Sequence, residues 1–269
     1  GGVGRDTATI GRYGLDVSRV ASMEDLESLS SGTVSEVAAV IIEPLIQGVN
    51  EMRPWPKGML AALRRWCDAH GVHLILDEVM TGFGRTGTMF ACQGEDVIPD
   101  FLCLAKGLTG GYLPMAATLT TGRIYDAFLG AEDQAFYYGH SYTANPLGCA
   151  AALASLEIFE TEMTLATLQS KIARLRELLA ELAGDHAEVH EVRQCGFIAG
   201  IELRRPDGSK FPVAERIGAE VCRAARKHGL LTRPILDTIV LMLPLLVSSE
   251  DLELAVKAIG RAIRDCFGA

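Results

Sequence analysis

The sequence has little that would attach it to a membrane or to nucleic acid. No apolar run reaches the length of about eighteen residues that a membrane-spanning helix needs. Basic residues are few, because 25 Lys and Arg face 34 Asp and Glu, which leaves a net charge of −9. Such a chain lacks the positive surface that nucleic acid and anionic membranes attract. We therefore expect a soluble, cytoplasmic protein.

Paired cysteines are also missing. The seven cysteines are scattered and never spaced as C-x-x-C, which indicates free thiols in a reducing compartment. Cys67, His70 and His73 come nearest to a metal-ligand spacing, but a helix-to-strand junction explains them better, so we expect no metal site. His186 and His190 lack the glutamate of an H-E-x-x-H motif between them, and we interpret them as a surface pair.

Apolar runs that alternate with helical patterns predict an α/β fold, with a mostly parallel sheet flanked by helices and a C-terminal α+β domain. Near residue 160 an alanine- and leucine-rich stretch gives way to a charged amphipathic one, which predicts domains at 1–160 and 161–269. Internal repeats are absent, which excludes a solenoid. The expected strands are 37–44, 72–78, 99–107, 114–121, 187–193, 197–204 and 238–244. The expected helices are 56–71, 123–129, 145–160, 161–182, 213–228 and a last one from 249.

A lysine ends the apolar stretch FLCLAKG, residues 101–107. Lys106 can be a surface cation whose stem lies along an apolar element. It can also be a buried amine, because a desolvated lysine has a lowered pKa and attacks carbonyl groups. The stretch alone does not decide between these interpretations.

Carboxylates end the neighbouring apolar stretch HLILDE, where Asp77 and Glu78 stand. Ligands of parallel α/β sheets bind outside the carboxyl ends of the strands, so we expect both carboxylates and Lys106 to line one crevice. A simple ion pair between carboxylate and lysine explains these residues equally well.

A glycine-rich segment, TGFGRTG, lies between these two strands and matches the dinucleotide pattern G-x-G-x-x-G at Gly82, Gly84 and Gly87. The dinucleotide motif needs these glycines directly after a strand and at the start of a helix. Here other residues intervene and no helical period follows. We therefore predict a tight irregular loop over a site.

Four motifs carry a family resemblance: IIEPLIQG, LILDEVMTGFGRTGTMFACQ, PDFLCLAKGLTGGYLPMAATLTT and GHSYTANPLGCAAALASLEIFE. In this order they resemble the class III aminotransferases, which are fold-type I enzymes that depend on pyridoxal 5'-phosphate. Within the class they are most similar to the enzymes that aminate 8-amino-7-oxononanoate in biotin biosynthesis. The resemblance runs from about residue 36 to the C-terminus, or about the last two thirds of such an enzyme.

The resemblance implies roles for five residues. Lys106 is the catalytic lysine that forms the internal aldimine with the cofactor. Asp77, also catalytic, pairs with the pyridinium nitrogen. Val79 packs against a face of the ring, although a plain core valine would be buried in the same way. Ser141 stands where the family usually has threonine and binds the cofactor phosphate from the neighbouring subunit of a homodimer. Arg233 pairs with the substrate carboxylate, although the loop after it departs from the family pattern.

The implied reaction is amino transfer to 8-amino-7-oxononanoate, which gives 7,8-diaminononanoate, with S-adenosylmethionine or lysine as donor. Another class III transaminase, acting on an ω-amino acid or a diamine, is the alternative, and an inactive fragment is a third. Glu43, at the end of a strand, resembles a glutamate with a supporting role near the cofactor. Residues 1–16 match neither the family's phosphate loop nor its ring-stacking aromatic residue, so we expect the 269 residues alone to be inactive.

Overall fold

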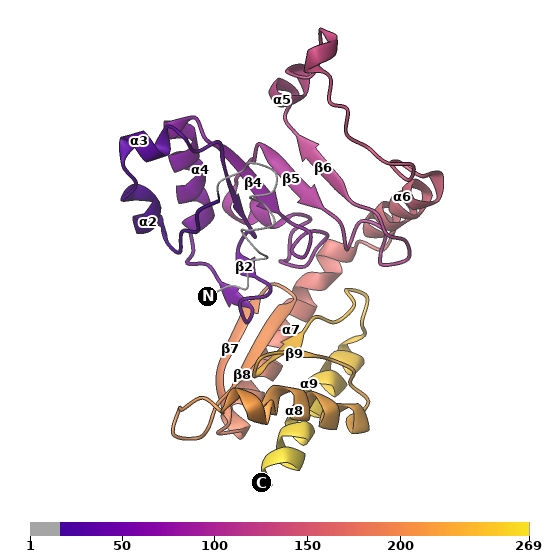
Figure 1. Ribbon diagram of the computed structural model, residues 1–269. Coiled ribbons are helices and arrows are strands. Elements are labelled where there is room, and N and C mark those ends of the chain that lie inside the picture. The colour runs from indigo at the N-terminus through magenta and orange to yellow at the C-terminus, as the bar shows by residue number, and fades with distance from the viewer. Residues whose placement is uncertain (1–16, 269) are drawn as a thin grey trace.

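The structure is a computed structural model that describes residues 17–268, and they form two larger sheets, each with its own helices (Figure 1). The expectation for residues 1–16 lies outside the described residues. The α-helices are α2 (Met23–Glu27), α3 (Ser31–Val34), α4 (Met59–His70), α5 (Gly122–Asp126), α6 (Pro146–Thr161), α7 (Thr164–Asp185), α8 (Ile217–Ala225) and α9 (Ser249–Phe267). Over this range, no helix is long and apolar enough to cross a membrane.

The first sheet has the order β1-β4-β5-β6, in strands β1 (Ala39–Ile42), β4 (His73–Asp77), β5 (Phe101–Leu104) and β6 (Ala117–Thr120). Its first two pairings are parallel, as expected, and they align Ile42 with Leu76 and Asp77 with Cys103. The β5–β6 pairing is antiparallel. Parallel strands need a long crossover, whereas β5 and β6 are joined by turns, so the chain reverses at this point.

One face of the first sheet carries its core. The leucines of β4 and β5 pack against α4, whose apolar residues recur at helical spacing; the members of this core include Leu60, Leu63, Trp66, Leu74, Leu76, Leu102 and Leu104. The opposite face is open in the described chain, where Ile41 is 63% exposed and Ile75 is half-buried. The functional residues at the strand ends therefore stand beside a face that the described chain leaves open.

The second sheet is antiparallel, in the order β7-β8-β10-β9. Its strands are β7 (Val189–Cys195), β8 (Ile198–Leu203), β9 (Pro234–Ile235) and β10 (Thr238–Leu241). Helices α7, α8 and α9 contribute to its core, which includes Leu175, Phe197, Ile201, Val221 and Ile259. A small hairpin of β2 (Ile46–Gln47) and β3 (Arg53–Pro54) connects the two regions, since β3 contacts β7.

Several boundaries differ from the predictions for local reasons. Met163 has φ 47° between α6 and α7, so these helices are separate elements, and the division into domains near residue 160 stays a prediction. The helix expected over 213–228 is split into a 3₁₀ turn (Val213–Glu215), α8 and a second turn (Arg226–His228). Strands β2, β3 and β9 span two residues each, which is too short for a periodic signal.

The prediction of a surface histidine pair is wrong for His186, which is buried to 5% exposure. It follows α7 and lies against α9, where it is 3.4 Å from Nη1 of Arg264. Burial lowers the pKa of His186, and the charge of Arg264 adds to this effect. The other histidine, His190, is exposed on β7.

The glycine-rich segment 81–87 joins the two regions. The Phe197 amide donates to the Arg85 carbonyl at 2.8 Å, and the Arg85 guanidinium donates to the Leu243 carbonyl. Burial lowers the pKa of Arg85. Gln169 of α7 donates to the Gly87 carbonyl at 2.8 Å. The Gly82 amide donates to the Glu78 carbonyl at 3.0 Å, so this loop contacts the end of β4 as well as α7 and the second sheet.

Replacing Gly196 by alanine should destabilise the protein through this contact. Gly196 has φ +58°, and a Cβ there would lie 2.3 Å from the Thr86 carbonyl carbon. Left-handed strain and a backbone clash together should cost about 2–4 kcal/mol. Gly208→Ala is the matched control, because Gly208 has φ +82° with no atom within 4 Å of its Cβ. Chemical denaturation measures both, and equal losses would contradict the contribution of the clash.

Candidate functional site

Asp77 is the last residue of β4 and lies half-buried at the carboxyl end of the first sheet. Its Oδ1 accepts the backbone N–H of Val79 at 3.1 Å, so the chain turns around the carboxylate directly after the strand. Val79 is also half-buried. The bond to Val79 leaves Oδ2 available to a cationic or N–H partner.

Glu78 does not share this crevice, contrary to the prediction. Successive side chains of a strand point to opposite faces, and Glu78 is fully buried on the other side of the chain. Its carboxylate accepts the amides of Ala91 and Cys92 at 2.6 and 2.9 Å and the Thr81 hydroxyl at 3.3 Å. These amides begin the short 3₁₀ helix η1 (Ala91–Glu95), so Glu78 has a structural role and fixes the start of this helix next to the end of β4.

Lys106 is exposed, as in the first of the two interpretations that its sequence allowed, and not a buried amine. The reason is its position: β5 ends at Leu104, and Lys106 lies in the turns that follow, where residues 110–114 are exposed as well. Within the described chain its amine makes neither a hydrogen bond nor an ion pair. Gly107 is needed beside it, because a Cβ there would lie 2.6 Å from Cβ of Phe83.

Glu43 shows that the charged groups of the site lie near one another. Its Oε2 accepts the Gly48 amide at 2.9 Å. Burial raises the pKa of Glu43, the bond from Gly48 opposes the rise, the negative charge of Asp77 adds to it, and the positive charge of Lys106 opposes it. Ile42, before Glu43, aligns with Leu76, before Asp77, so these two carboxylates end neighbouring parallel strands.

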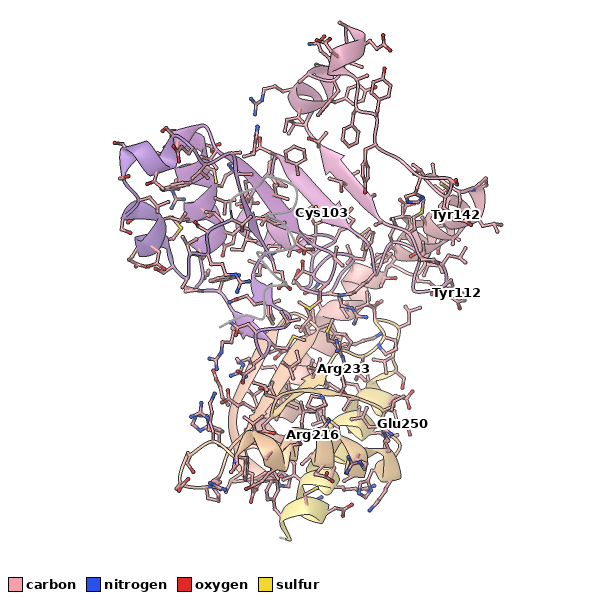
Figure 2. All side chains as sticks on the ribbon, viewed as in Figure 1. Cys103, Tyr112, Tyr142, Arg216, Arg233 and Glu250 are labelled. Atoms are coloured by element: carbon pink, nitrogen blue, oxygen red, sulfur yellow. The ribbon has the colours of Figure 1, made fainter. Side chains whose placement is uncertain are left out.

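Cys103 is a site neighbour that the sequence interpretation missed. It pairs in register with Asp77 on β4 and with Thr118 on β6 (Figure 2). Burial raises the pKa of its thiol, Thr118 opposes the rise and the Asp77 charge adds to it. Aligning the ends of two parallel strands would have placed the third residue of FLCL beside Asp77.

A hollow of about 1150 Å³ opens next to Lys106. Its lining includes Tyr112 on one side and His140 and Tyr142 on the other, and Figure 2 shows both tyrosines on the side of the molecule that carries α6. Ser141 stands between two lining residues and is exposed, so its segment and Lys106 border one space.

Arg233 lies apart from this hollow. It immediately precedes β9, in the region of the second sheet, and its side chain is exposed (Figure 2). Its carbonyl accepts the Val240 amide at 3.1 Å, which fixes the backbone of the arginine to β10. The structure thus joins Asp77 to Val79 by a hydrogen bond and places Lys106 after the neighbouring strand. The segment of Ser141 borders the same hollow as Lys106, and among the described residues no contact joins Arg233 to these side chains.

The side chains at the strand ends offer an exposed amine and a half-buried carboxylate. An accessible amine can bind an aldehyde, and a carboxylate can hold a protonated nitrogen. Metal chemistry has no comparable support, because residues 17–268 contain no cluster of three His, Cys, Asp or Glu side chains that could hold an ion. His70 instead directs its Nδ1 to the Trp66 carbonyl at 2.8 Å.

Comparison with known proteins gives a consistent result. The chain is 49% identical over 248 residues to adenosylmethionine-8-amino-7-oxononanoate aminotransferase of Nitratidesulfovibrio vulgaris, covering 91% of this chain and 46% of the relative. It is 37% identical over 250 residues to an omega-aminotransferase of Caulobacter vibrioides, covering 92% of this chain and 54% of the relative. The chain therefore spans about half the length of such relatives, rather than the two thirds that we expected.

Solved structures agree with these relatives. Adenosylmethionine-8-amino-7-oxononanoate aminotransferase of Methanocaldococcus jannaschii superposes with a TM-score of 0.87 at 41% identity, covering 91% of this chain and 57% of that one. An amine transaminase of an uncultivated Pseudomonas species, in its PLP-bound internal aldimine form, gives 0.85 at 36%, covering 91% and 56%. The family described as Aminotransferase class-III matches residues 12–263, which begins earlier than the expected residue 36. The chain belongs to the class III aminotransferases.

Proposed function

We propose that this chain is part of an enzyme that transfers an amino group to 8-amino-7-oxononanoate and forms 7,8-diaminononanoate. The observation that carries the proposal is the placement of Asp77 at the end of β4 and of Lys106 just after β5, the parallel strand beside it. Relatives that are 41–49% identical and named for this substrate support the choice of acceptor. S-adenosylmethionine and lysine are the two candidate donors.

The residues at the strand ends fit pyridoxal 5'-phosphate. The Lys106 amine matches its aldehyde, the Asp77 carboxylate its ring nitrogen, and Val79 an apolar side of its ring. The hydroxyl of Ser141 is a hydrogen-bond donor suited to its phosphate. When bound, the cofactor supplies an electron sink for the carbon that loses its proton.

The reaction then requires proton movement by this chain. Lys106 would accept a proton from the donor carbon and donate it again later, acting in turn as base and acid. The negative charge of Asp77 would favour a protonated ring nitrogen on the bound cofactor, because an opposite charge favours the charged form. Arg233 pairs its planar guanidinium with the carboxylate of the acceptor. The donor leaves as a carbonyl compound, and the acceptor ketone becomes an amine.

Activity in this proposal belongs to a protein of the relatives' length that contains this chain, which we call the full-length protein below. The chain spans only 46–58% of its relatives, so the 269 residues alone should be inactive. A homodimer with a shared site is part of the proposal. The exposed aromatic side chains between β5 and α6, such as Tyr112 at 88% and Tyr138 at 80%, support it. Seven free cysteines support a cytoplasmic location.

A transaminase for ω-amino acids or diamines is the second candidate. It is favoured by the omega-aminotransferase and the amine transaminase among the similar proteins. These enzymes would share Lys106 and Asp77, so the charged groups at the strand ends do not separate the two candidates. The acceptor does.

The test is to supply the full-length protein with either donor and 8-amino-7-oxononanoate, and separately with ω-amino acids and diamines. We expect 7,8-diaminononanoate from the first mixture. Arg233→Ala should lower kcat/KM for the carboxylated acceptor. The loss corresponds to about 2–5 kcal/mol of transition-state stabilisation, because the carboxylate loses its partner. Arg216→Ala, at an exposed arginine, is the control. Turnover of diamines alone would establish the second candidate.

A further inference from the structure

The inference concerns Arg193, a buried arginine of β7 that lies outside the site. It is 3% exposed, and its guanidinium has a different partner on each side. Nη1 contacts the carboxylates of Glu191 and Glu202, and Nη2 donates to Oγ1 of Thr238 at 3.1 Å. Nε donates to the backbone carbonyl of Glu51 at 3.0 Å. This last bond leaves the second sheet and reaches the hairpin segment.

The segment that receives this bond, residues 48–53, has a strained backbone. Glu51 and Met52 have φ values of 56° and 54°, in the left-handed region that side chains disfavour. Such a conformation persists only where its surroundings hold it. The Thr238 hydroxyl lies 3.3 Å from Oε2 of Glu51, and Met52 is 2% exposed among Ile46, Ile198 and Val240. The second sheet therefore determines the shape of residues 48–53.

The other end of this segment reaches the candidate site. The Met52 amide donates to the Gly48 carbonyl at 3.4 Å, which closes the turn, and the Gly48 amide donates to Oε2 of Glu43 at 2.9 Å. The Trp55 indole, just after the segment, donates to the Glu43 carbonyl at 2.9 Å, so Glu43 is held at both its carboxylate and its carbonyl. Glu43 follows Ile42, which aligns with Leu76 of β4, so Glu43 and Asp77 end neighbouring parallel strands, and the charges of Asp77 and Lys106 both affect the pKa of Glu43. A continuous path of contacts thus runs from Arg193 to the charged groups at the strand ends.

We propose that Arg193 is a positioning residue that, through residues 48–53, fixes the Glu43 carboxylate beside Asp77 and Lys106. The proposal rests on the proposed function for its catalytic consequence, whereas the path of contacts stands without it. Arginine suits this position because one planar guanidinium serves Glu202, Thr238 and the Glu51 carbonyl together. A lysine ammonium keeps the charge beside Glu202 but lacks this fork.

The test compares Arg193→Lys with Arg204→Lys in the full-length protein. Arg204 also donates to Glu202, at 2.8 Å, and to the Gly208 carbonyl, but within the described chain it does not bond residues 48–53 directly. Its link to that segment is Glu202, which forms an ion pair with Arg53 at 3.7 Å. Both variants therefore weaken the bonds to the buried Glu202 carboxylate. Only Arg193→Lys also removes the hydrogen bond to the Glu51 carbonyl. In amide hydrogen exchange, Arg193→Lys should raise the rates at Gly48 and Met52 roughly 5- to 10-fold, the effect of one lost hydrogen bond. Arg204→Lys should leave them within about 2-fold.

A second variant covers the case in which Arg193→Lys fails to fold. Thr238→Val removes a hydroxyl that bonds Arg193 and Glu51 without leaving a buried charge unpaired, and it should raise the same exchange rates roughly 3-fold. Unchanged exchange at Gly48, or an equal rise in Arg204→Lys, would overturn the positioning role.

Kinetics separate this proposal from the proposed function. Arg193→Lys should lower kcat roughly 10-fold with KM for the acceptor nearly unchanged, because the substrate contacts remain. If exchange changes as expected while every variant lacks transaminase activity, the proposed function fails and the positioning role stands. If the protein is an active transaminase but exchange does not change, the positioning role fails alone.

Discussion

Replacing Lys106 by alanine should reduce amino transfer by the full-length protein roughly 10⁴-fold, the largest effect that we expect from a single side chain. The amine has two tasks in the proposed reaction, because it binds the cofactor aldehyde and then moves the proton. Its surroundings agree with both, since it is exposed beside a hollow of about 1150 Å³ and the described chain gives it no bonding partner. Stopped-flow measurement of a single half-reaction checks this loss without interference from product release.

Covalent mapping adds a readout that does not depend on turnover. Borohydride converts a lysine–aldehyde linkage into a stable secondary amine, so peptide mass analysis after reduction with pyridoxal phosphate should find the added mass on Lys106. Lys57→Ala is the control variant, because Lys57 is an exposed lysine before α4. Labelling that stays in Lys106→Ala, or that lies on another lysine of the wild-type protein, would remove Lys106 from its role.

Local patterns predicted much of the fold. The spacing of Leu60, Leu63 and Trp66 marks the buried side of α4, and the apolar run before Asp77 marks β4. The alignment of Asp77 with Cys103 follows once the strands are parallel. The direction of β6 was left open, because the turns after Lys106 carry no signal that distinguishes reversal from crossover.

The environment of the site residues was harder to predict, because it depends on partners far along the chain. The Glu78 carboxylate is bound by the amides of Ala91 and Cys92, which residue type alone does not reveal. Arg85 meets a carbonyl 158 residues away, and Arg193 meets one 142 residues away. The residues that make these contacts follow no regular spacing in the sequence, so no local pattern predicts them. The apolar neighbours of Lys106 left its burial undecided, because Leu102 and Leu104 face the core while the lysine follows the strand end.

Asp77→Asn should slow the half-reaction of the full-length protein on the order of 10³-fold while the fold remains. In the wild-type protein the Val79 amide donates to Oδ1 of Asp77 at 3.1 Å. Asparagine keeps the size of the side chain and an oxygen that can accept this bond, so β4 should end as before. The negative charge is lost, and with it the stabilisation of a protonated ring nitrogen. Asp68→Asn is the control, because Asp68 is an exposed aspartate of α4 paired with Arg64.

A titration distinguishes loss of charge from a change of structure. The charge of Asp77 raises the pKa of Glu43, because a second carboxylate nearby disfavours ionisation. Asp77→Asn removes this effect, so the pKa of Glu43 should fall and the carboxyl should ionise at a lower pH than in the wild-type protein. NMR of the Glu43 side chain measures the change, with Asp68→Asn expected to leave it in place. A near-normal half-reaction together with an unchanged Glu43 titration would show that Asp77 does not act on this site through its charge.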